Sequence, residues 1–128
     1  MHVLVFGAGA VGGYFGALLA RGGHAVTFVA RGENLAALER DGLTVHLGAD
    51  TLRVAPVRAI ADPAEAPRPD LVLVCVKSYD TPAAAAALAP VVGPDTVILS
   101  LQNGVENEDV LARALHLPPL LVALTRIG

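Results

Sequence analysis

The chain has 128 residues, the size of one domain with a substantial hydrophobic core. Hydrophobic residues make up 54% of the sequence and charged residues 16%, a composition typical of a sheet buried on both faces. The formal net charge of −3 provides no basic surface for nucleic acid, and the single cysteine, Cys75, excludes an intramolecular disulfide framework and a multi-cysteine zinc site.

Strand and helix patterns alternate along the chain. The sequence predicts strands over residues 3–6, 25–29, 71–76, 96–101 and 120–124, and helices over 11–21, 34–41, 81–91 and 106–115. Gly22 and Gly23 are predicted to end the first helix. This order predicts one α/β domain spanning 1–128, a doubly wound, mostly parallel sheet with right-handed crossovers and helices on both faces.

Two segments depart from this alternation. Residues 43–47 and 52–55 alternate between apolar and polar around Gly48-Ala49-Asp50, which predicts a small hairpin. Residues 60–70 contain three prolines and are predicted to form a connecting loop rather than a helix.

Targeting, membrane and metal signals are weak in this sequence. The start lacks a basic region and runs directly into a strand, so no signal peptide is expected. The apolar span 10–20 is interrupted by glycine and is shorter than the ~20 residues of a membrane helix, which predicts a soluble, cytoplasmic protein. The four histidines are scattered without ligand spacing, and no metal site is expected.

A glycine-rich motif follows the first strand and opens the first helix. In G-x-G-x-x-G, the first glycine permits the tight turn, the second lets a pyrophosphate approach the backbone, and the third lets the helix pack on the sheet. The helix N-terminus then faces the anion. The sequence therefore predicts a dinucleotide-binding, Rossmann-like fold, with the cofactor on Gly7, Ala8, Gly9, Ala10, Val11 and Gly12.

The end of the second strand carries the signal for cofactor choice. An acidic residue about twenty positions beyond the glycines binds the adenosine ribose of NAD. Here that acid is missing and Arg31 stands beside its place, where a guanidinium can bind a 2′-phosphate with two hydrogen bonds. NADP is therefore preferred over NAD. The alternative is a solvated Arg31 with Glu33 as a displaced ribose ligand.

Two polar residues follow later strands at the edge where open α/β sheets bind ligands. Lys77, the only lysine, comes after the apolar run 71–76, and its charge could meet a cofactor or a substrate carboxylate. Asn103 follows the next strand and offers an amide donor and acceptor. A surface lysine and an ordinary Asn-Gly turn are the alternatives. Cys75 is predicted to be an inert buried thiol.

Three stretches together resemble a known family. GAGAVGGYFGALLARGGHAVTFVARGENLAALERDGL, VKSYDT and SLQNGVENED occur in this order, and the chain resembles the N-terminal domain of ketopantoate reductase over essentially its whole length. The resemblance implies NADPH-dependent reduction of 2-dehydropantoate to pantoate, a step toward pantothenate and coenzyme A. It also implies a pyrophosphate on the Gly7–Gly12 turn, the 2′-phosphate on Arg31, Lys77 near the nicotinamide half, and Asn103 on both cofactor and substrate.

The resemblance also defines what this chain lacks. Family members continue into a helical C-terminal domain that supplies a lysine as general acid, so no catalytic residue is expected within 1–128. We therefore expect NADPH binding with little or no reductase activity, and self-association into a homodimer is a further expectation. A stand-alone NADP-binding sensor and the cofactor domain of another 2-oxo acid reductase are the alternative functions.

Overall fold

The computed structural model describes residues 1–7, 9–75 and 81–100. Within them a five-stranded sheet has the order β5-β2-β1-β6-β7, and every neighbouring pair in it is parallel. Its strands are β1 (His2–Phe6), β2 (Ala25–Val29), β5 (Arg58–Ile60), β6 (Leu71–Val74) and β7 (Val97–Ser100). The helices are α1 (Ala10–Arg21), α2 (Gly32–Asp41), the 3-10 helix η1 (Pro63–Glu65) and α3 (Thr81–Leu88). The predicted Rossmann-like, doubly wound fold is confirmed.

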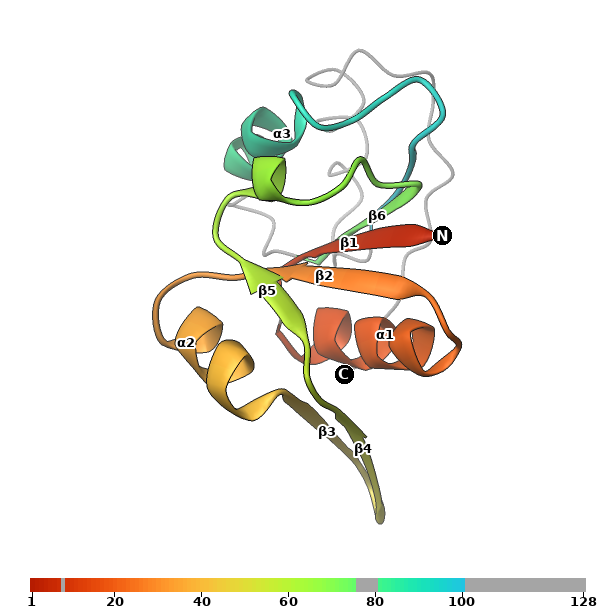
Figure 1. The fold of residues 1–128 in the computed structure, drawn as a ribbon, viewed down its shortest axis with the longest axis vertical. Coiled ribbons are helices and arrows are strands. Elements are labelled where there is room, and N and C mark those ends of the chain that lie inside the picture. Colours follow the sequence, from red (N-terminus) through yellow and green to blue (C-terminus); the bar gives the residue numbers. More distant parts are fainter. Residues whose placement is uncertain (8, 76–80, 101–128) are drawn as a thin grey trace.

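Apolar residues of the central strands alternate between the two faces of the sheet. Figure 1 shows α1 and α2 on one side of the sheet and α3 on the other. Each face has its own buried cluster, since successive side chains of a strand point to opposite sides. The α1 side buries Val3, Val5, Ala17, Phe28, Leu38, Leu43 and Leu73, and the α3 side buries Leu4, Val29, Val72, Val74, Ala85, Leu88 and Ile98.

The first helix packs unusually close to the sheet because it presents glycine there. A Cβ atom added to Gly16 would lie 2.5 Å from the Phe28 ring. The helix ends at Gly22 as predicted, with Gly23 at a φ of 93°. The amide of Gly23 donates to the carbonyl of Ala20, and that of His24 donates to the carbonyl of Leu19. These two bonds form a Schellman cap, which orients the chain into β2.

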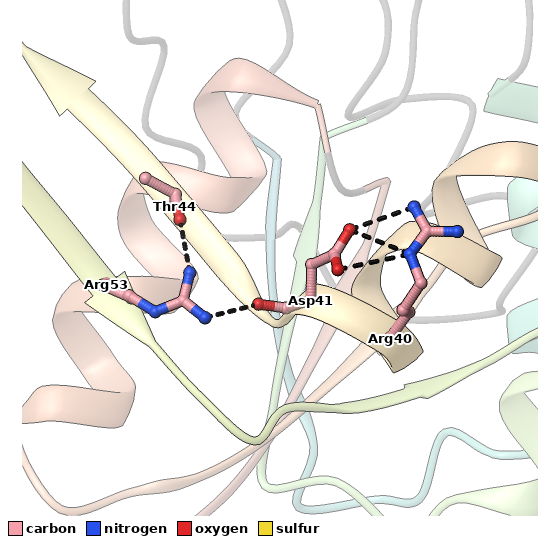
Figure 2. A network of polar contacts seen from close by, with 4 residues as sticks. All are labelled: Arg40, Asp41, Thr44 and Arg53. Atoms are coloured by element: carbon pink, nitrogen blue, oxygen red, sulfur yellow. Dashed lines mark hydrogen bonds and ion pairs between the residues drawn. The ribbon is translucent and has the colours of Figure 1, made fainter.

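The predicted hairpin is present as the antiparallel pair β3 (Leu43–Leu47) and β4 (Asp50–Val54). It packs against α1, where a Cβ on Gly13 would lie 3.5 Å from the side chain of Leu43. Figure 2 shows how it is joined to α2: the Arg53 guanidinium donates to the Thr44 hydroxyl at 3.0 Å and to the Asp41 carbonyl at 2.9 Å. Arg40 forms a solvent-exposed ion pair with the Asp41 carboxylate.

Several boundaries differ from the prediction. The segment 60–70 is not wholly a loop, since Ile60 belongs to β5 and Pro63–Glu65 forms η1. Strand β6 ends at Val74 and α3 at Leu88, before the predicted ends at 76 and 91. The predicted strand 120–124 and helix 106–115 lie outside the described residues. Among the described helices, none is long and apolar enough to span a membrane.

Candidate functional site

The glycine turn leaves the carboxyl end of β1 as the sequence predicts. Gly7 has a φ of 106°, a conformation that other L-residues rarely adopt. Its amide donates to the carbonyl of Val29 at 3.3 Å, which ties the turn to the end of the neighbouring strand β2. The chain then reaches Gly9, the N-cap of α1, in an extended conformation. Ala8 lies outside the described residues.

The N-terminus of α1 is open to an anion. A helix leaves its first amides without intrahelical acceptors. Here no N-cap side chain satisfies them, because the cap is Gly9, and the first turn contains no acidic residue. The positive end of the helix dipole is therefore neutralised neither by a side-chain cap nor by a first-turn carboxylate. The backbone of residues 10–12 is the part of the motif that could bind a phosphate.

The second and third glycines of the motif have different roles. Apart from its chain neighbours, no atom of the described residues would lie within 4 Å of a Cβ on Gly9, so this part of the chain leaves the space beside its backbone open. A Cβ on Gly12 would lie 2.1 Å from the carbonyl oxygen of Gly7 and 3.1 Å from the side chain of Val5. Gly12 therefore permits the packing of α1 on the sheet, while Gly9 leaves an approach to the backbone.

Arg31 stands at the carboxyl end of the next strand. It is the N-cap of α2, extended at φ −145° and ψ 160°, and is followed by Gly32 at φ 59°. Its exposed side chain makes no hydrogen bond or ion pair with the described part of the chain. Glu33, the alternative ribose ligand, is exposed in the first turn of α2. The choice between the two stays a prediction.

The two halves of the sheet diverge next to the glycine turn. After β1 the chain crosses through α1 to β2, whereas after β6 it crosses through α3 to β7 on the other side. The edge outside such a divergence is where open α/β sheets bind ligands. Cys75 follows β6 there, and its amide donates to the carbonyl of Phe6 at 2.9 Å. Cys75 is partly rather than fully buried. Desolvation still raises the pKa of its thiol to about 12, so the thiol is protonated at neutral pH.

Metal chemistry has no support in the described ranges. No group of three or more His, Cys, Asp or Glu side chains could hold an ion among residues 1–7, 9–75 and 81–100.

Comparison with known proteins identifies the family. The family model for "Ketopantoate reductase PanE/ApbA" matches residues 3–128. The chain belongs to the ketopantoate reductase family.

Relatives in this family are much longer than the chain. The 2-dehydropantoate 2-reductase of Halobacterium salinarum is 40% identical over all of this chain, which spans 42% of that protein. The enzyme of the same name from Archaeoglobus fulgidus is 43% identical over 88% of this chain and 35% of its own length. The chain thus spans less than half of these ketopantoate reductases.

Solved structures agree with the assignment. A PanE/ApbA family ketopantoate reductase from Ralstonia eutropha has a TM-score of 0.84 and 44% identity over 95% of this chain and 40% of its own. D-mandelate dehydrogenase, solved with NADH and anilino(oxo)acetate, also has a TM-score of 0.84 at 21% identity and shares the fold. The family is one of NAD(P)-dependent oxidoreductases with a Rossmann-like domain.

Two predicted site residues of this ketopantoate reductase domain, Lys77 and Asn103, fall outside the described residues, and their roles stay predictions. The structure brings the Gly7 turn, the start of α1 and Arg31 to one edge of the sheet. Sequence reasoning missed Ile60, whose carbonyl accepts the amide of Ala30 at 3.0 Å just before Arg31. The only signal for it was the alternation of Val57, Arg58 and Ala59 before it, which is too short to show a period.

Proposed function

We propose that this chain is the NADP-binding domain of an NADPH-dependent 2-dehydropantoate 2-reductase, which reduces 2-dehydropantoate to (R)-pantoate in pantothenate and coenzyme A biosynthesis. The observation that carries the proposal is the pairing, at one sheet edge, of an uncapped helix N-terminus with an arginine that has no partner among the described residues. A dinucleotide with an additional phosphate requires two such anion contacts.

The described residues fit this cofactor. The open space beside Gly9 admits a pyrophosphate to the first amides of α1, since no side chain in the described ranges approaches it within 4 Å apart from its chain neighbours. Arg31 is free to form two parallel hydrogen bonds with a 2′-phosphate, where a carboxylate would repel it. When bound, NADPH supplies the hydride of the reduction.

Lys77 and Asn103 complete the proposed site on the strength of the family motifs. Lys77 would contact the cofactor near its nicotinamide half, and Asn103 would contact both the cofactor and the 2-oxo acid. An ammonium group suits a substrate carboxylate, and an amide suits both a ribose hydroxyl and a substrate oxygen.

Reduction of a ketone also requires a proton donor for the developing alkoxide. Cys75 is poorly suited to this task because burial raises its pKa to about 12. In the family the donor is a lysine of the C-terminal domain. We therefore expect residues 1–128 to bind NADPH and to turn over 2-dehydropantoate slowly or not at all. We propose that the reaction takes place in the cytoplasm and involves neither nucleic acid nor a membrane. We also propose that the chain forms a homodimer, which sedimentation would test.

The decisive experiment is a titration of the purified chain with NADPH and with NADH, followed by nicotinamide fluorescence. Binding of NADPH more tightly than NADH would support the proposal. A matched control is Arg21→Ala, which removes an exposed guanidinium at the opposite end of α1 and should leave both affinities unchanged. The absence of any binding at millimolar cofactor would refute the proposal.

A further inference from the structure

One peptide group connects the glycine turn to the edge strand β5. The carbonyl of Val29 accepts the amide of Gly7 at 3.3 Å. The amide of Ala30, on the same peptide group, donates to the carbonyl of Ile60 at 3.0 Å. A continuous hydrogen-bond chain therefore runs from the turn, through the end of β2, to the end of β5. Such bonds in series polarise and strengthen one another.

Arg31 comes directly after this peptide group. Its side chain has no partner in the described part of the chain, so the place of the guanidinium is set by its backbone. That backbone is extended at Arg31 and then turns sharply at Gly32, whose φ of 59° begins α2. The Val29–Ala30 peptide is thus the fixed point from which Arg31 projects.

The hydrogen bond from Ala30 to Ile60 depends on a very short strand. Strand β5 has three residues, and its neighbour in the sheet is β2. Ile60 packs against the cluster on the α3 side, and Ala59 packs against the cluster on the α1 side. Arg58 donates to the carbonyl of Glu65 at 3.0 Å, which closes the segment after the strand. These contacts hold the Ile60 carbonyl in place.

We propose that β5 is a positioning element for cofactor selectivity. Through the Val29–Ala30 peptide it fixes the spacing between the Gly7 turn and Arg31, and so the spacing between the pyrophosphate and 2′-phosphate contacts. This inference rests on the proposed function. A ligand that uses both contacts gains from a rigid spacing, because no ordering is left to occur on binding. NADH uses only the first contact and is insensitive to the spacing.

The first test is Ile60→Ala, which removes the packing of the strand end and leaves the backbone groups intact. We expect the Kd for NADPH to rise about fivefold and the Kd for NADH to change less than twofold, as loss of preorganisation predicts. The matched control is Ile98→Ala, on β7 and in the buried cluster against which Ile60 packs. It should lower thermal stability without changing the ratio of the two dissociation constants.

A second pair of variants separates a change in cofactor selectivity from a general loss of folding. Arg58→Ala removes the exposed side chain that closes the segment after β5, and Arg53→Ala removes an equal charge from the hairpin. The NADPH preference should fall in the first variant and persist in the second. If wild type prefers NADPH and both Ile60→Ala and Arg58→Ala keep that preference, β5 has no positioning role and the proposed function stands.

A measurement without cofactor tests the connection itself. Amide hydrogen exchange by nuclear magnetic resonance should show faster exchange at both Ala30 and Gly7 in Ile60→Ala than in Ile98→Ala. Faster exchange at Ala30 alone would break the proposed connection. Equal affinity of the wild-type chain for NADPH and NADH would instead overturn the proposed function and the selectivity role with it, even if the exchange at Gly7 responded.

Discussion

The carbonyl oxygen of Gly7 lies so close to Gly12 that a Cβ atom added to Gly12 would stand 2.1 Å from it. The same Cβ would be 3.2 Å from the Cβ of Cys75. Two ends of one motif, five residues apart, are thus packed against each other at the point where β1, α1 and β6 meet. This contact makes the third glycine a structural requirement, separate from any contact with a ligand.

Gly12→Ala should therefore destabilise the fold. The clash is with backbone, which cannot rotate away as a side chain can, so we expect a loss of about 3 kcal/mol in the free energy of unfolding. Thermal denaturation should show a midpoint lowered by roughly 10 °C. A midpoint within 2 °C (roughly 0.5 kcal/mol) of wild type would mean that α1 does not pack as described.

Gly9→Ala should leave the stability of the fold nearly unchanged and weaken cofactor binding. Its backbone angles suit any L-residue, and nothing in the described part of the chain beyond its chain neighbours lies within 4 Å of the new methyl group, so unfolding free energy should change by less than about 1 kcal/mol. The methyl group would stand where a pyrophosphate approaches the amides of α1. Both NADPH and NADH should then bind about tenfold more weakly, measured by fluorescence titration. Unchanged affinity for both cofactors would place the pyrophosphate elsewhere.

Arg31→Asp should separate the two cofactors. It replaces a charge-assisted attraction with a repulsion at the proposed 2′-phosphate position, so the Kd for NADPH should rise roughly 100-fold. The Kd for NADH should change little, because NADH carries a hydroxyl there. Titrating both cofactors into Arg31→Asp and Arg21→Asp would measure this, with the second variant controlling for net charge. A parallel loss of both affinities in Arg31→Asp would contradict the assignment.

Cys75 predicts a dependence of stability on alkaline pH. Burial raises the pKa of its thiol from 9.0 to about 12, so the unfolded chain loses this proton at lower pH than the folded chain. The contribution of the buried neutral thiol is full below pH 9.0 and is lost as pH rises toward about 12. Urea unfolding between these values should show stability falling by up to about 1.4 kcal/mol per pH unit from this group.

The matched control for that prediction is Cys75→Ala, which should remove this part of the pH dependence. Reaction of the wild-type thiol with a disulfide reagent at pH 8 should also be slow in the folded chain and fast in urea, because only the thiolate reacts. Fast modification of the folded protein would show that the thiol is neither buried nor protonated.

The sequence predicted the central elements because their signals are local. Strand β2 and the hairpin strand β3 match their predicted ranges, and α1 begins one residue early, since hydrophobic period and glycine caps reveal such elements directly. Strand β5 was missed because three residues are too short for a period to show, and its pairing depends on β2. Its residues become a strand only through tertiary contact.

In the candidate site, too, the features with local sequence signals were predicted and those that depend on tertiary contact were not. The G-x-G-x-x-G spacing predicted the turn and the open start of α1, because the motif is contiguous in the chain. The sequence also placed Arg31 at the end of β2, which is where the structure has it. The connection from Gly7 through Val29 to Ile60 joins three separate segments by main-chain groups alone. No side-chain pattern encodes it, so it could be seen only in the assembled fold.

The hairpin β3–β4 provides a site for attaching a fluorescent label to this protein. Figure 1 shows it reaching away from the sheet edge that carries the glycine turn, and residues 48 and 49 at its tip are exposed. A fluorescent label attached through Ala49→Cys, in a background with Cys75→Ala, would sit at the exposed tip of the hairpin, away from the glycine turn. Energy transfer from reduced nicotinamide to that label would then report occupancy by colour, while the glycine turn and Arg31 stay unchanged.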